Sequence, residues 1–148
     1  MQEKICGFCG HRLVTHDISE QVRDIIINLI ENEGINTFYS GSMGEFDNLC
    51  EKTIRDLKKI YNNIKLCRIM PYHMLSVNNN PEYYYRLFDE IIVPDFENTH
   101  YKKAITMRNR WIADCSDFLI CYTRYESGGA YNTRRYAEKT NTHVIDIK

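Results

Sequence analysis

The sequence has no long hydrophobic run. Its longest uninterrupted apolar stretches, such as 25–27 and 118–122, fall far short of the roughly 18 residues that a membrane-spanning helix needs. The first residues lack the basic and then apolar pattern of a signal peptide. We therefore expect a cytoplasmic protein with no membrane partner.

An excess of charge of one sign is also missing. The chain carries 19 Lys and Arg residues against 20 Asp and Glu residues, which gives a formal net charge of −1. Domains that bind nucleic acid usually carry a basic excess, so nucleic acid is not expected as a partner. The apolar share of 43% and the length of 148 residues are ordinary for a globular chain, and we expect one domain over residues 1–148.

The cysteines lack the second CxxC pair that a zinc ribbon needs. Among six cysteines, Cys6 and Cys9 have this spacing and no other pair does. They are expected in a strand and the turn after it, whereas a redox CxxC opens a helix, and disulfides are rare in the cytosol. We predict no metal site, no catalytic disulfide and no cofactor.

The apolar pattern predicts strands that alternate with helices. Short buried runs predict strands at about 4–9, 36–40, 65–70, 89–93, 118–122 and 143–147. Helical periodicity predicts a helix from the capping-box spacing of Asp17 and Glu20 to Gly34, and helices at 46–61, 81–88, 101–115 and 130–139, with 76–81 as a loop. This alternation indicates an α/β fold, a single Rossmann-like domain with a doubly wound, mostly parallel sheet and helices on both faces.

Three glycine-containing loops are expected at the rim of the sheet where such folds bind ligands. They span 7–12, 41–44 and 127–129, after the first, second and fifth strands. Gly128 and Gly129 would expose backbone N–H groups at a helix start, which suits phosphate, and Ser127 and Thr133 would add hydroxyl donors. A plain tight turn is the alternative. None of the loops carries GxGxxG, so a dinucleotide-dependent dehydrogenase has weak support.

Two carboxylates follow the second glycine loop. Asp47 and Glu51 are four residues apart, which puts them on one helical face, and we expect that face to lie away from the apolar stripe. Paired carboxylates suit hydrogen bonds to ribose hydroxyls or acid and base catalysis at an anomeric carbon. The alternative is that they complement the helix dipole.

Arg108 interrupts the apolar stripe of the helix expected at 101–115. A buried guanidinium needs a partner, because burying it unpaired is costly. The partner is either a permanent carboxylate, such as Asp47 or Asp114, or the phosphate or ribosyl group of a ligand, and we predict the ligand. The alternative is a stem along the stripe edge with its head in water.

Three further residues are candidates by position. His11 and Arg12 follow the first strand at the same rim, where they would contact a phosphate or a base unless they are plain solvated loop residues. Asn109 adjoins Arg108 on the helix expected at 101–115.

Four segments together resemble a known family. They are 6–12, 40–47 with Glu51, 107–114 and 127–137, and they span nearly the whole chain in order. The chain resembles the SLOG superfamily in its YpsA-like branch, a set of Rossmann-like nucleotide-binding proteins that includes the LOG phosphoribohydrolases and DprA. The resemblance implies a nucleotide or ADP-ribose-like ligand at the predicted loops. The ligand-binding residues would be Gly7, His11, Arg12, Gly41, Ser42, Gly44, Asp47, Arg108, Asn109, Ser127, Gly128, Gly129 and Thr133.

One departure from the family pattern bears on activity. LOG enzymes carry PGGxGTxxE with a catalytic final glutamate, whereas here Tyr136 stands three residues after Thr133. The first hypothesis is therefore a cytosolic sensor that binds the ligand without hydrolysing it. The alternative is an N-glycoside hydrolase acting on a nucleoside monophosphate, with Asp47, Glu51 and Arg108 as its catalytic residues. Both hypotheses leave open a homodimer.

Overall fold

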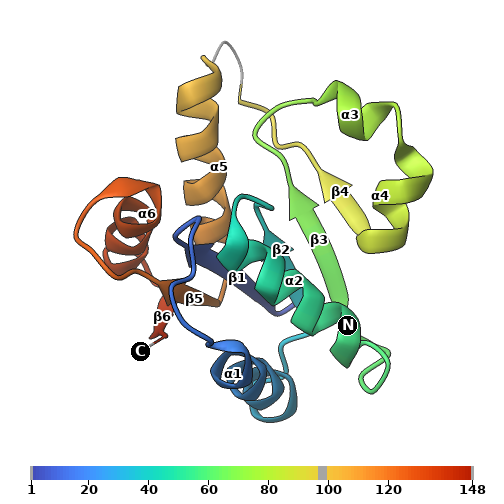
Figure 1. The fold of residues 1–148 in the computed structure, drawn as a ribbon, viewed down its shortest axis with the longest axis vertical. Helices are drawn as coiled ribbons and strands as arrows, with labels where there is room; N and C mark the ends of the chain where they lie inside the picture. Colours follow the sequence, from blue (N-terminus) through green and yellow to red (C-terminus); the bar gives the residue numbers. More distant parts are fainter. Residues whose placement is uncertain (1, 97–99, 148) are drawn as a thin grey trace.

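A computed structural model describes residues 2–96 and 100–147, which contain a six-stranded, all-parallel sheet (Figure 1). The strands are β1 (Ile5–Gly10), β2 (Thr37–Ser40), β3 (Lys65–Ile69), β4 (Glu90–Ile92), β5 (Phe118–Tyr122) and β6 (His143–Asp146). The helices are α1 (Ser19–Asn32), α2 (Glu45–Leu57), α3 (Leu75–Asn78), α4 (Pro81–Leu87), α5 (Tyr101–Cys115) and α6 (Gly128–Glu138). The predicted α/β class and the single Rossmann-like domain are confirmed.

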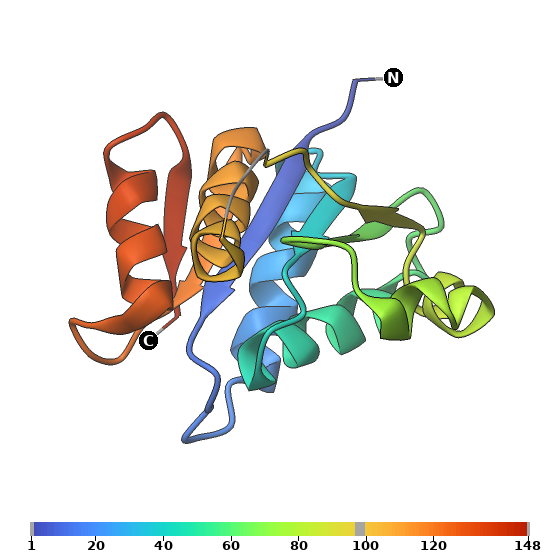
Figure 2. The ribbon, with the colours of Figure 1, turned by 90° about the horizontal axis from the view of Figure 1, so that it is seen from above.

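Helices cover both faces of the sheet (Figure 2). One apolar cluster joins α1, α2 and α4 to one face and includes Cys6, Phe38 and Ile54. A second cluster joins α5 and α6 to the other face and includes Cys9 and Ile112. Successive side chains of a strand point to opposite faces, so two residues three apart, such as Cys6 and Cys9, belong to different clusters.

The strand order is β4-β3-β2-β1-β5-β6, so the chain reverses direction across the sheet between β1 and β5. From β1 the chain builds outward to β2, β3 and β4, and it then crosses through α5 to β5 on the other side of β1. Open parallel sheets bind ligands at the carboxyl ends of the strands at such a reversal. The loops after β1 and β5 flank that position.

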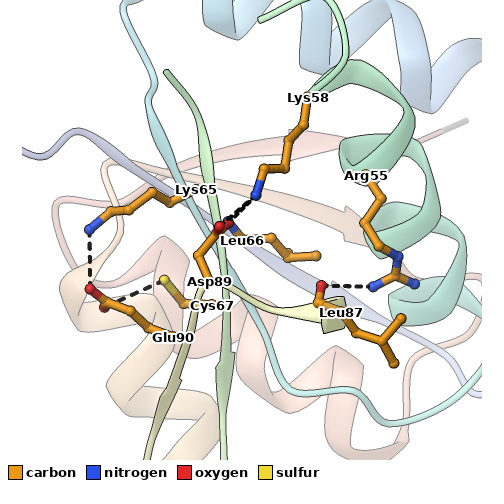
Figure 3. A network of polar contacts seen from close by, with 8 residues as sticks. All are labelled: Arg55, Lys58, Lys65, Leu66, Cys67, Leu87, Asp89 and Glu90. Atoms are coloured by element: carbon orange, nitrogen blue, oxygen red, sulfur yellow. Dashed lines mark hydrogen bonds and ion pairs between the residues drawn. The ribbon is translucent and has the colours of Figure 1, made fainter. Parts of the chain in front are cut away.

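A polar network ties the sheet edge at β4 to α2, and Figure 3 shows it. Nζ of Lys58 donates to both carboxylate oxygens of Asp89 at 2.5 Å, and Asp89 Oδ2 accepts the backbone N–H of Leu66 at 2.8 Å. Arg55 Nη1 also donates to the Leu87 carbonyl oxygen at 3.3 Å. These contacts fix the carboxyl end of α2, at the opposite end of the helix from Glu45.

Three local expectations are wrong. Residues 76–81 were expected as a loop, but α3 forms one helical turn there, and the amide of Asn80 donates to the Ser76 carbonyl oxygen at 2.6 Å. The expected capping box does not start α1, because its N-cap is Ile18 and Asp17 reaches only the N–H of Ser19, at 3.0 Å. The last helix begins at Gly128, two residues before the expected start.

None of the helices in residues 2–96 and 100–147 combines the length and the apolar character needed to cross a membrane.

Candidate functional site

A pocket of about 350 Å³ lies at the reversal between β1 and β5. The end of β1, the loops after β2 and β5, and parts of α2, α5 and α6 form its walls. The predicted ligand-binding residues that line it are His11, Arg12, Gly41, Asp47, Arg108, Asn109, Gly128, Gly129 and Thr133. The structure brings these residues together from four separate segments of the chain, 11–12, 41–47, 108–109 and 128–133.

The start of α6 forms one wall of the pocket. Ser127 is the N-cap residue, and Gly128 has a φ of +92°, which a residue with a side chain rarely adopts. A Cβ built at Gly128 or Gly129 would meet no heavy atom within 4 Å, so the backbone there faces open space. The first N–H groups of a helix have no partner within the helix, and the dipole favours an anion at this end.

The hydroxyl of Thr133 was expected to donate to a ligand, but it donates within the protein. Its hydroxyl donates to the Gly129 carbonyl oxygen at 2.8 Å, within the helix itself. The Thr133 proton is therefore used by α6, although the residue lines the pocket.

Asp47 lines the pocket, and one of its carboxylate oxygens is unpaired. The residue is 7% exposed, and its Oδ2 accepts the backbone N–H of Met43 at 2.9 Å, whereas its buried Oδ1 has no hydrogen-bond partner. Burial, and secondarily the charge of Glu51, raises the pKa of Asp47 to about 7 against the opposing effects of the Met43 hydrogen bond and the Arg108 charge. The carboxyl group therefore exists in both protonation states near neutral pH.

Glu51 has a structural environment that the sequence did not indicate. It is 4% exposed, and its Oε2 accepts the hydroxyls of Ser40 at 2.6 Å and Ser42 at 2.5 Å. Glu51 and Ser42 are not among the pocket-lining residues of the described chain. Both carboxylates were expected on a face of their helix away from the apolar stripe, where they could face the ligand. Both are buried, and of the two only Asp47 lines the pocket.

The Ser42 backbone is held in an unusual conformation. Its φ of 52° is the one positive value at a non-glycine position in the described residues. Its N–H donates to the Ser40 hydroxyl oxygen at 3.1 Å, while its own hydroxyl donates to Glu51. Glu51 therefore anchors the loop between β2 and α2.

Arg108 is buried, with 1% exposure, and its partners are two backbone carbonyls, the Asn109 side chain and the sulfur of Met43. Nη1 donates to the carbonyl oxygens of Gly41 at 2.9 Å and Ile69 at 3.1 Å, and Nε donates to Asn109 Oδ1 at 2.9 Å. Burial lowers the pKa of Arg108, and the charge of Asp47 opposes this effect.

Two of the expected arrangements for Arg108 are therefore wrong. Its head is not in water, and neither Asp47 nor Asp114 is a hydrogen-bond partner of it in the described residues. Asp114 Oδ1 instead accepts the hydroxyl of Tyr136 at 2.7 Å. The guanidinium lies at the carboxyl ends of β2 and β3, where the carbonyl oxygens of Gly41 and Ile69 accept its hydrogen bonds.

His11 forms the wall on the β1 side. It is 6% exposed, and its Nε2 accepts the backbone N–H of Arg124 at 2.8 Å, which assigns the ring proton to Nδ1. Burial lowers the pKa of His11, so the imidazole is neutral at neutral pH. The ring stacks on Tyr125, with centroids 3.9 Å apart and planes 9° apart.

Tyr125 was missed by the sequence reasoning, although it lines the pocket. The available signal was its position in the loop that leaves the fifth strand, two residues before Ser127. Its contact with His11 joins residues 114 positions apart and has no local signature.

The remaining predicted residues lie beside the pocket. Gly7 was expected in a loop but lies within β1, where an added Cβ would be 2.5 Å from Ile112, so its role is the close packing of α5. Gly44 is the N-cap residue of α2, with a φ of +104°, and an added Cβ would be 2.5 Å from the Cα of Arg12. These close approaches bring the loops after β1 and β2 together.

Cys6 and Cys9 belong to opposite faces of the sheet, as described above. Cys9 Sγ contacts the Ala130 carbonyl oxygen at 3.0 Å. In the described part of the chain, no cluster of three or more His, Cys, Asp or Glu side chains has the geometry to hold a metal ion.

Solved structures share this fold. DNA processing protein A (DprA) from Streptococcus pneumoniae matches over 99% of this chain and 50% of its own, with a TM-score of 0.72 and 17% identity. DprA from Helicobacter pylori, whose structure is described as revealing a single-stranded DNA binding mode, matches over 97% and 64%, with a TM-score of 0.68 and 18% identity. The structural genomics target TM1055 matches over 95% and 72%, with a TM-score of 0.58 and 14% identity.

These likenesses establish a shared Rossmann-like fold. The chain spans about half the length of the pneumococcal protein and less than two thirds of that from Helicobacter pylori. No protein-family model and no curated protein matches the sequence.

Proposed function

We propose that this chain is a member of the SLOG superfamily, in its YpsA-like branch, and a cytoplasmic sensor of a nucleotide or ADP-ribose-like ligand. The observation that carries the proposal is that Asp47, whose buried Oδ1 has no partner, lines the same pocket as the open start of α6. A buried polar atom without a partner is costly in an empty protein and is explained by a ligand group that satisfies it.

The two features suit two parts of one ligand. The backbone at Gly128 and Gly129 suits a phosphate, as at other helix N-termini. The Asp47 carboxylate suits donors such as the hydroxyls of a ribose. A pocket of about 350 Å³ is within the size range of small-ligand sites.

The second candidate function is the N-glycoside hydrolase. Its support is the pKa of Asp47 of about 7, which is suitable for a general acid or base at neutral pH. Glu51 does not support it, because two serine hydroxyls occupy its Oε2. The hydrolase hypothesis thus rests on Asp47 as its carboxylate, with Arg108 in the same pocket.

The test is a calorimetric titration of the full chain with AMP, ADP-ribose, ribose 5-phosphate and a single-stranded oligothymidylate. We expect the phosphate-bearing small ligands to bind and the oligonucleotide not to bind, in keeping with the balanced net charge of −1. Binding of the oligonucleotide alone would favour the DNA-binding property described for one DprA and would contradict the proposal.

Chromatography of the incubated AMP separates the sensor from the hydrolase. The sensor leaves AMP intact, whereas the hydrolase releases free adenine, and this release should be lost in Asp47→Asn. Size-exclusion chromatography with and without ligand tests the homodimer.

A further inference from the structure

Tyr125 lies in the loop between β5 and α6, and a neighbouring ring fixes it in place. One face of its ring is covered by the imidazole of His11, with centroids 3.9 Å apart. The residue is nevertheless 58% exposed and lines the pocket. More than half of the Tyr125 surface therefore stays open, although His11 stacks on its ring.

His11 is itself held by the end of β5 and the loop that follows it. Its backbone N–H donates to the Tyr122 carbonyl oxygen at 3.1 Å, and its Nε2 accepts the N–H of Arg124 at 2.8 Å. An aromatic ring on such a support loses little conformational freedom when a ligand binds it. The pair is therefore a preorganised flat surface.

From this geometry we infer that Tyr125, supported by His11, stacks the base of the bound nucleotide and selects ligands that carry an aromatic ring. This inference rests on the proposed function and specifies which part of the ligand the β5–α6 loop recognises. His11 is the positioning residue of the pair.

The placement suits a single nucleotide. Tyr125 precedes Gly128 by three residues, so their Cα atoms are at most about 11 Å apart. A ligand whose phosphate lies at the start of α6 thus has Tyr125 within reach of its other end. Every nucleobase has a π-face, so an aromatic surface recognises a base with little dependence on its identity.

The experiment compares ligands with and without a base. We expect AMP, GMP and UMP to bind the wild-type chain at least fivefold more tightly than ribose 5-phosphate does. Tyr125→Ala should weaken AMP binding by roughly five- to 150-fold, the range measured for loss of one stacked base. It should leave the affinity for ribose 5-phosphate within twofold, and Tyr125→Phe should retain AMP binding.

Tyr85→Ala is the matched control, because Tyr85 is 57% exposed and lies on α4, outside the pocket. It should change neither affinity. The inference is overturned if Tyr125→Ala leaves AMP affinity unchanged, or weakens AMP and ribose 5-phosphate equally. If no phosphate-bearing ligand binds the wild-type chain, the proposed function fails as well, so the two failures are distinguishable.

Discussion

The carbonyl oxygen of Gly41 accepts a hydrogen bond from Nη1 of Arg108 at 2.9 Å, and a Cβ on Gly41 would lie 2.9 Å from the guanidinium carbon. The glycine therefore provides both the acceptor and the space for the buried cation. Through this contact α5 supports the loop after β2, on which Asp47 depends through its bond to Met43.

Arg108→Met tests the supporting role. It should lower the free energy of unfolding of the empty chain by about 1.5–3 kcal/mol, the usual contribution of hydrogen bonds to a charged group, because buried carbonyls lose their donor. Urea denaturation measures this. Arg110→Met is the matched control, since exposed Arg110 contacts only the Tyr136 ring among the contacts described, and it should change stability by less than about 0.5 kcal/mol. Unchanged stability in Arg108→Met would contradict the supporting role and favour the ligand contact that the sequence predicts for Arg108.

Gly41→Ala tests the space beside Arg108. The new methyl group would displace the guanidinium, and overpacking of this kind costs about 1–3 kcal/mol. Gly129→Ala is the matched glycine, because its Cβ would meet open space, and it should unfold at the wild-type denaturant concentration. Equal unfolding midpoints for the two variants would contradict the close approach.

Asp47→Asn should stabilise the empty chain, and more so at high pH. The folded pKa of about 7 lies above the usual 3.8, so the folded state binds more protons than the unfolded state between these values. The wild type therefore loses stability as the pH rises through that window, by up to about 4 kcal/mol, whereas the asparagine variant has no such loss. Denaturation at pH 4, 6 and 8 measures the difference. Parallel pH profiles of the two proteins would contradict a buried, unpaired Asp47.

Glu51 should act through the serines and not on the ligand. A double-mutant cycle of Glu51→Ala and Ser42→Ala should give a coupling energy of about 1–3 kcal/mol in unfolding experiments, because the two side chains share a charge-assisted hydrogen bond. As a control, Asp56→Ala replaces Glu51→Ala in the same cycle with Ser42→Ala. Because Asp56 is on the exposed side of α2, this coupling energy should be near zero. Two near-zero values would show that the buried contact contributes nothing.

The alternating pattern of the sequence was sufficient for the fold and for the rim that holds the pocket. The spacing of apolar residues in each segment depends on which of its own residues are buried, so it can be read without knowing the rest of the fold. The residue types of Gly128, Gly129 and Asp47, together with their places after predicted strands, were also sufficient to predict them as site residues. All three line the pocket.

The partners of individual side chains were not predictable in the same way. Arg108 pairs with carbonyl oxygens, which every residue carries, so no residue type marks Gly41 or Ile69 as acceptors. The serines at Glu51 and the stacking of Tyr125 on His11 depend on strand order and loop path. Such contacts follow from the fold and are invisible in a linear pattern.

The most direct test of the proposed function is the affinity of AMP for the wild-type chain and for Gly129→Val, measured by calorimetry beside the unfolding midpoint of each. A side chain at Gly129 projects into open space and would cover the position that we propose for the phosphate without touching the core. The account predicts saturable AMP binding to the wild type, a loss of at least tenfold in Gly129→Val, and equal midpoints. Equal AMP affinity in both proteins, or no binding to the wild type, would contradict it.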